Sequence, residues 1–125
     1  MTTNPPELGI SVLEDDELVR KARSAENGRR FQLLFDHGWE SPAVREVYEK
    51  PRHARLALIN HLIWWARHDT DQVRRLFRRS ALCPGDLTRY RAYFVELVRS
   101  AVALLGRECY DPGYAAADGD GEGSQ

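Results

Sequence analysis

The feature that most constrains this chain is an apolar run that leaves no side polar. Residues 53–69 read HARLALINHLIWWARHD, and apolar residues at positions 56, 58, 59 and 62–65 cover nearly every side of a helix. Such a helix is typical of the centre of a bundle, because other elements must cover it all round. The run is shorter than the roughly 20 residues that span a membrane. It therefore predicts the central helix of a bundle, with no membrane partner.

Two helices are predicted ahead of this run. The acidic letters EDDE suit the positive end of a helix over residues 15–25. A short second helix follows a break at Asn27-Gly28, and Gly38 can end it with a left-handed cap. Residues 39–52 are ambiguous, because two prolines bracket a stretch with room for two helical turns.

The stretch DTDQVRRLFRRSALCPGD at residues 69–86 predicts the next helix, which Asp69 or Thr70 can cap. Val73, Leu76 and Phe77 fall on one side. The opposite side carries what we call the arginine stripe, which consists of Arg74, Arg75, Arg78 and Arg79.

The last helix is predicted after the turn CPGD. Its apolar residues alternate in spacing between three and four, which is the heptad pattern of a helix that packs along a partner. They are Leu87, Tyr90, Phe94, Leu97, Ala101 and Leu104. Gly106 is expected to end the helix.

The length of 125 residues suits one domain with a single core. We predict an all-α fold, a small bundle of about five helices at residues 13–108. Residues 1–12 contain two prolines and a glycine and are expected to form a flexible arm. Residues 109–125 are small, acidic and glycine-rich, so we expect a disordered tail. Two cysteines and an N-terminus without a signal-peptide pattern favour a cytoplasmic protein.

Charge is segregated along the chain, although the formal net charge is only −1. Residues 1–49 carry six basic and ten acidic side chains, residues 50–107 carry twelve and four, and residues 108–125 carry none and five. A basic middle between acidic ends permits a polyanionic partner on one face. A high-GC genome also favours arginine, so the arginines alone do not establish such a partner.

No recognisable catalytic or cofactor motif is present. The sequence has no CxxC or HExxH metal-ligand pair, no GxSxG nucleophile turn and no GxxxxGK[ST] phosphate loop. We therefore predict a protein that is not an enzyme, with no metal site and no cofactor.

Three side chains of the apolar run have a second interpretation besides packing. Trp64 and Trp65 could stack on nucleobases, but in an apolar helix we expect them to be divided between the core and the bundle edge. His61 lies seven positions before His68, too far for one metal ion, and is expected in the core or at the edge.

The arginine stripe is either the solvated side of a helix or a phosphate-binding face, to which Arg89 and Arg91 would add. Only Asp69 and Asp71 offset it locally in the sequence. A solvated side does not need charges of one sign, so phosphate contact is favoured.

Ordered pieces of the chain resemble the helical-bundle domain of primase-polymerases encoded by phages, plasmids and other mobile elements. These pieces are DDELVRKARSAENGRRFQLLFDHGWES, ARLALINHLIWWARHD and TDQVRRLFRRSAL, within residues 15–82. In that family the bundle follows a primase domain and often precedes a helicase. The segment between Trp39 and Ala54 is longer and more charged than the family pattern, and the last helix matches only faintly, near Tyr93 and Glu96.

The resemblance implies a non-catalytic DNA-binding accessory module in mobile-element DNA replication, since the primase's catalytic acids are missing. Its implied partners are DNA, as a single strand or a template–primer, and a primase-polymerase or helicase. Two alternatives remain open. One is a small protein-interaction adaptor that docks on a replication enzyme, and the other is a helix-turn-helix regulator with its turn at CPGD.

Overall fold

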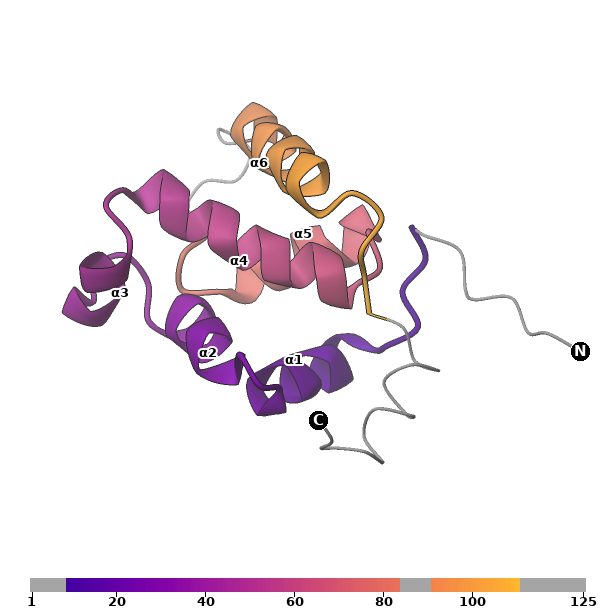
Figure 1. Cartoon of the computed structure of the whole chain (residues 1–125), viewed down its shortest axis with the longest axis horizontal. Coiled ribbons are helices and arrows are strands. Elements are labelled where there is room, and N and C mark those ends of the chain that lie inside the picture. Colours follow the sequence, from indigo (N-terminus) through magenta and orange to yellow (C-terminus); the bar gives the residue numbers. More distant parts are fainter. Residues whose placement is uncertain (1–8, 84–90, 111–125) are drawn as a thin grey trace, which may run out of the picture.

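The computed structural model describes residues 9–83 and 91–110, and these form six α-helices and no strand (Figure 1). The helices are α1 (Asp15–Ser24), α2 (Gly28–Asp36), α3 (Pro42–Val47), α4 (Pro51–Trp65), α5 (Thr70–Arg79) and α6 (Arg91–Leu105). The predicted all-α bundle is confirmed. The additional helix, α3, lies in the segment that the sequence left ambiguous. Pro42 and Pro51 each begin a helix, where proline sacrifices no helical hydrogen bond.

α4 is the centre of the bundle, as its sequence predicts. It packs against α1, α2, α5 and α6, and in Figure 1 it crosses the middle, with α6 on one side and α1 and α2 on the other. Its buried side chains are Ala54, Leu58, Ile59, Leu62, Ile63 and Trp65. Trp64 is only partly buried, so the two tryptophans divide between core and edge as expected. Among the described helices, none has the length and apolar character needed to cross a membrane.

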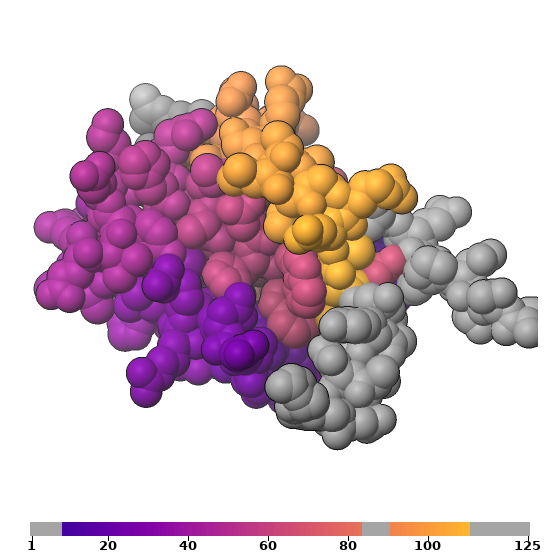
Figure 2. Space-filling model, viewed as in Figure 1, coloured from indigo at the N-terminus to yellow at the C-terminus, as the bar shows by residue number. Residues whose placement is uncertain are grey.

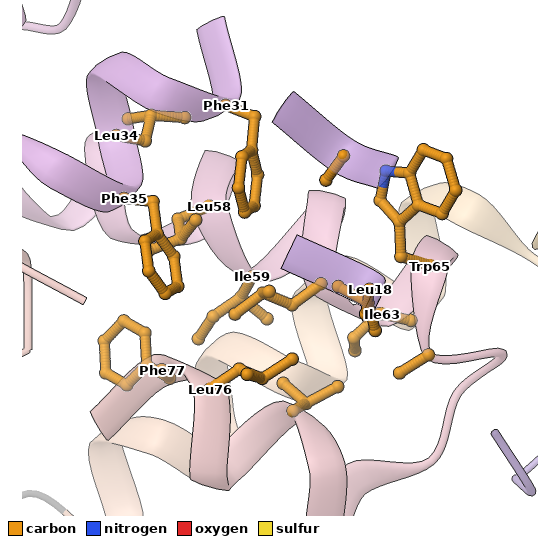
Figure 3. Packing of buried hydrophobic residues seen from close by; sticks show 14 of the residues in the cluster. Leu18, Phe31, Leu34, Phe35, Leu58, Ile59, Ile63, Trp65, Leu76 and Phe77 are labelled. Carbon is orange, nitrogen blue, oxygen red and sulfur yellow. The ribbon is translucent and has the colours of Figure 1, made fainter. Parts of the chain in front are cut away.

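The core forms where α2 and α5 meet α4 (Figure 3). Phe31 and Phe35 of α2 stack with their ring centroids 5.2 Å apart. Leu76 and Phe77 of α5 point toward Ile59 of α4, and all five side chains are buried. Each large apolar side chain contributes about 1.5–3 kcal/mol when fully buried, so these contacts hold the two helices against α4.

The turn between α4 and α5 contacts both ends of the described chain. Arg67 and His68 have positive φ angles of 54° and 66°, which side-chain-bearing residues adopt only when their surroundings hold them there. The carbonyl of Arg67 accepts a hydrogen bond from the Gly9 N–H at 2.6 Å, and its guanidinium donates to the carbonyl of Tyr110. A ring nitrogen of His68 lies 3.1 Å from the carbonyl of Glu108.

These contacts move the boundaries of the bundle outward. Tyr110 is buried against the tryptophans of α4, so the core extends two residues beyond the predicted limit of 108. The Ser11 N–H donates to the carboxylate of Asp69 at 3.2 Å, so the end of the predicted arm belongs to the fold. Residues 1–8 and 111–125, the rest of the predicted arm and tail, lie outside the described residues.

The heptad seam predicted for the last helix is only partly correct. Its buried members are Phe94, Leu97 and Ala101. Leu104 is 70% exposed, and Leu105 packs against the core in its place together with Val98 and Val102. The second half of α6 therefore turns a different side toward α4. Leu87 and Tyr90, the first two seam residues, lie outside the described residues.

Candidate nucleic-acid interface

α5 presents the arginine stripe to solvent. Asp69 begins the helix by accepting hydrogen bonds from the backbone N–H groups of Asp71 and Gln72, at 3.1 and 3.2 Å. The buried residues of α5 are Gln72, Val73, Leu76 and Phe77. All four arginines of the stripe are exposed. The two-sided arrangement predicted from the sequence is therefore confirmed.

Two acidic residues of α1 lie against the arginine stripe. Arg75 donates from Nε and Nη2 to the two carboxylate oxygens of Asp15, at 3.0 and 2.9 Å. Nη2 of Arg79 lies 3.1 Å from a carboxylate oxygen of Asp16. The prediction that acids of the same helix alone offset the stripe is therefore wrong, because folding brings α1 beside α5.

Asp15 is the more firmly held of the two acids. Besides Arg75, the buried side chain of Gln72 donates to it at 2.9 Å and to the carbonyl of Leu13 at 2.7 Å. The hydrogen bond from Arg75 lowers the pKa of the Asp15 carboxyl, and the bond from Gln72 lowers it further, against the opposing effect of partial burial. Arg75 is thus part of the link between α1 and α5.

The other two arginines of the stripe are less restrained. Nη1 of Arg74 lies 3.3 Å from Asp71, whose side chain is 79% exposed, and the guanidinium lies 5.7 Å from the ring centroid of Phe94. Arg78 has no ion-pair partner among the described residues. Exposed ion pairs contribute only about 0–1 kcal/mol, so a phosphate can replace Asp71 at little cost.

Arg91 extends the basic surface from α5 to α6. It is exposed at the start of α6 and lies three positions, about one turn, before Phe94. Phe94 is the ring that Arg74 covers, so this end of α6 adjoins the arginine stripe. Arg89, the remaining predicted phosphate contact, lies outside the described residues.

A second candidate site, which the sequence analysis did not predict, is an open pocket of about 740 Å³ that we call the α4 pocket. Its polar and aromatic lining comprises Asn27, Arg30, Tyr48, Asn60, His61 and Trp64. The α1–α2 turn, α4 and the end of α6 line it, and Figure 2 shows these three parts side by side on one face. One signal was present in the sequence, since Asn60 and His61 interrupt the apolar run.

The α4 pocket and the arginine stripe lie on different sides of the bundle. At 100° per residue, Ala57, His61 and Trp64 fall on the side of α4 opposite Ile59. Ile59 faces α5 (Figure 3), and the arginines point away from that contact into solvent. The two sites are therefore separate surfaces.

Polar groups of the α4 pocket are held in place by their neighbours. Arg30 donates to the hydroxyl of Tyr48 at 3.3 Å, with its guanidinium 5.9 Å from the centre of that ring. The ring of His61 meets Phe31 edge-to-face at 5.9 Å. Burial lowers the pKa of His61, and the charge of Arg30 lowers it further. Oδ1 of Asn60 is buried and has no hydrogen-bond partner among the described residues.

Comparison with known proteins places the later part of the chain in a family. No curated protein and no solved structure matches the chain. A family model described as the NrS-1 polymerase HBD domain, a helical-bundle domain, matches residues 51–112. The match begins with α4 and includes the arginine stripe and α6, and thus overlaps the residues 15–82 that carry the resemblance only in part. The resemblance to a helical-bundle domain of primase-polymerases is confirmed, and over residues 51–112 the chain matches the NrS-1 polymerase-like family of these domains.

Proposed function

We propose that this chain is a non-catalytic DNA-binding accessory module in mobile-element DNA replication. The observation that carries the proposal is the exposed arginine stripe, in which Arg78 lacks an ion-pair partner among the described residues and Arg74 pairs only with an exposed acid. Guanidinium groups bind phosphate in bidentate fashion and set affinity without reading sequence. The family match supports a replication context, because it spans the whole stripe.

The arginines are not equivalent in this proposal. Arg74 and Arg78 are available to phosphate directly, and Arg91 lengthens the track onto α6. Arg75 and Arg79 contact α1 through Asp15 and Asp16, so a phosphate has to displace a carboxylate there. The proposed partners are single-stranded DNA or a template–primer, together with a primase-polymerase or helicase.

The adaptor alternative has less support. It requires a continuous apolar surface, and α6 exposes Val95 and Leu104. Nine positions at 100° each place these two side chains on opposite sides of the helix, so they form no common patch. The helix-turn-helix alternative depends on a turn at residues 83–86, most of which lies outside the described residues.

The test is the salt dependence of binding to single-stranded DNA. Each phosphate that is neutralised adds roughly 0.7 to the magnitude of the slope of log affinity against log salt. The double variant Arg74→Ala with Arg78→Ala should therefore flatten that slope by about 1.4. A charge-matched control replaces Arg29 and Arg99, exposed arginines of α2 and α6, and should leave the slope unchanged. Absence of salt-sensitive binding of the wild type to single- or double-stranded DNA at low ionic strength would contradict the proposal.

A further inference from the structure

We infer that the α4 pocket is a binding site for an unpaired nucleobase. The inference rests on the proposed function, since it assumes that the chain works on nucleic acid, but it uses a surface separate from the arginine stripe. The pocket volume of about 740 Å³ lies in the range of small-molecule sites, which run from about 300 to 1,000 Å³. It is larger than a base alone and leaves room for the attached sugar.

Trp64 supplies an aromatic surface for stacking. It is half-buried and lines the pocket. Trp65 meets it edge-to-face at 4.9 Å, and Tyr110 does so at 6.1 Å. These contacts fix the indole without covering it face to face, so stacking is left to a ligand. A base that stacks on a tryptophan gains a large contact with little loss of freedom in the protein.

Hydrogen-bonding groups of the pocket match the edge of a base. Asn27 and Asn60 contribute amides, and an amide can donate and accept at once, as base edges require. Oδ1 of Asn60 lacks a partner among the described residues, and a half-turn of the amide brings it to the pocket side. His61 is held neutral by its buried position, so it offers one donor and one acceptor.

Charge at the pocket rim suits a nucleotide. Arg30 lines the pocket and is exposed, so its guanidinium can reach a phosphate attached to a bound base. Glu26 is the one acidic residue of the lining, which offers a cation no paired carboxylates. The ligand class is therefore a nucleobase, either in a free mononucleotide or in a single strand.

The first experiment titrates adenosine, guanosine, cytidine and thymidine into the full chain and follows ligand signals by saturation-transfer NMR. Uncharged nucleosides exclude a contribution from the arginine stripe. At least one should bind. Ala57→Phe fills the pocket without removing a core side chain, because Ala57 lines it and is only partly buried, and should abolish binding. The matched control Ala103→Phe, at an exposed position of α6 outside the lining, should have no effect.

A second variant tests stacking. Trp64→Ala should weaken nucleoside binding by about 5- to 100-fold, the range found for single base–aromatic stacks. Circular dichroism of this variant checks that the bundle persists. If folding fails, Asn60→Ala replaces it and should weaken binding several-fold. Failure of all four nucleosides to bind the wild type overturns the inference, as does equal binding by Ala57→Phe and wild type.

The source of the base is distinguished with two strands of equal length and charge, one with bases and one abasic. A base held from a strand gives the wild type higher affinity for the strand with bases, and Ala57→Phe removes that difference. If Ala57→Phe loses nucleosides but binds both strands as the wild type does, the pocket takes a free nucleotide. Nucleoside binding without any DNA binding would remove the proposed function and leave the pocket. DNA binding without nucleoside binding would do the reverse.

Discussion

Arg75 of α5 and Asp15 of α1, sixty positions apart in the sequence, form a two-point ion pair at 2.9 and 3.0 Å. The pair attaches α1 to the helix that carries the arginine stripe. Because the same guanidinium also faces solvent, a phosphate that binds Arg75 has to compete with Asp15. One half of the stripe therefore contributes to the fold, while the other half, with Arg74 and Arg78, is free for a ligand.

Asp15→Asn is expected to lower the melting temperature at neutral pH by about 2–4 °C, the scale of a partly screened ion pair. The pKa of folded Asp15 lies below its ordinary value of 3.8. Its stabilising effect is therefore complete above that value and is lost as the pH falls through 3.8 toward the folded pKa. Thermal melts at about pH 5 and about pH 3 should show a larger loss for the wild type than for the variant. An equal loss in both proteins would contradict this assignment.

The helices could be predicted because they depend on local patterns. The apolar run of α4 and the two-sided pattern of α5 are visible in the spacing of neighbouring residues. The partner of Asp15 could not be predicted, because an acidic stretch at a helix start is already explained by the helix dipole. The α4 pocket was missed for a related reason. Its lining comes from separate segments that include Asn27, Tyr48 and Asn60, and no local pattern connects them.

Gln72→Met is expected to lower the free energy of unfolding by about 1–2 kcal/mol. Nε2 of this buried residue donates to the carbonyl of Leu13 at 2.7 Å and to Asp15 at 2.9 Å, and the variant leaves the carbonyl unpaired. The loss stays moderate because Oε1 of Gln72 has no partner in the described chain. Urea denaturation measures it. Gln32→Met, at an exposed position of α2 with one 3.4 Å hydrogen bond, is the control and should change stability little.

Stability should fall as the pH is lowered from about 7 to about 5, and His61→Gln should reduce that fall. Burial lowers the pKa of folded His61 below its ordinary value of 6.5. The unfolded chain then takes up a proton near pH 6.5 that the folded chain refuses, so stability is lost as the pH drops from 6.5 toward the folded pKa. Urea denaturation at both pH values tests this. His53→Gln, at an exposed position of α4, should retain the wild-type dependence.

The purified chain should neither extend a DNA primer nor hydrolyse ATP. The sequence has no phosphate loop and no activated nucleophile motif, and the described residues contain no group of three acids, histidines or cysteines able to hold a metal ion. Primer-extension and phosphate-release assays across the fractions of a sizing column provide the measurement. Turnover that follows the protein peak would refute the non-catalytic proposal.

Asp16→Asn should strengthen binding to single-stranded DNA, because it releases Arg79 for phosphate. The Asp16 side chain is 90% exposed and contacts Arg79 at 3.1 Å, so its removal should leave the fold intact. One additional phosphate contact increases the magnitude of the salt slope by roughly 0.7. Glu46→Gln removes the same charge at an exposed position of α3, and any gain that it shares with Asp16→Asn reflects net charge alone. In an Arg79→Ala background the effect of Asp16→Asn on the slope should vanish, as required if the two side chains act as a pair. Persistence of the full effect in that background would show that Arg79 does not bind phosphate.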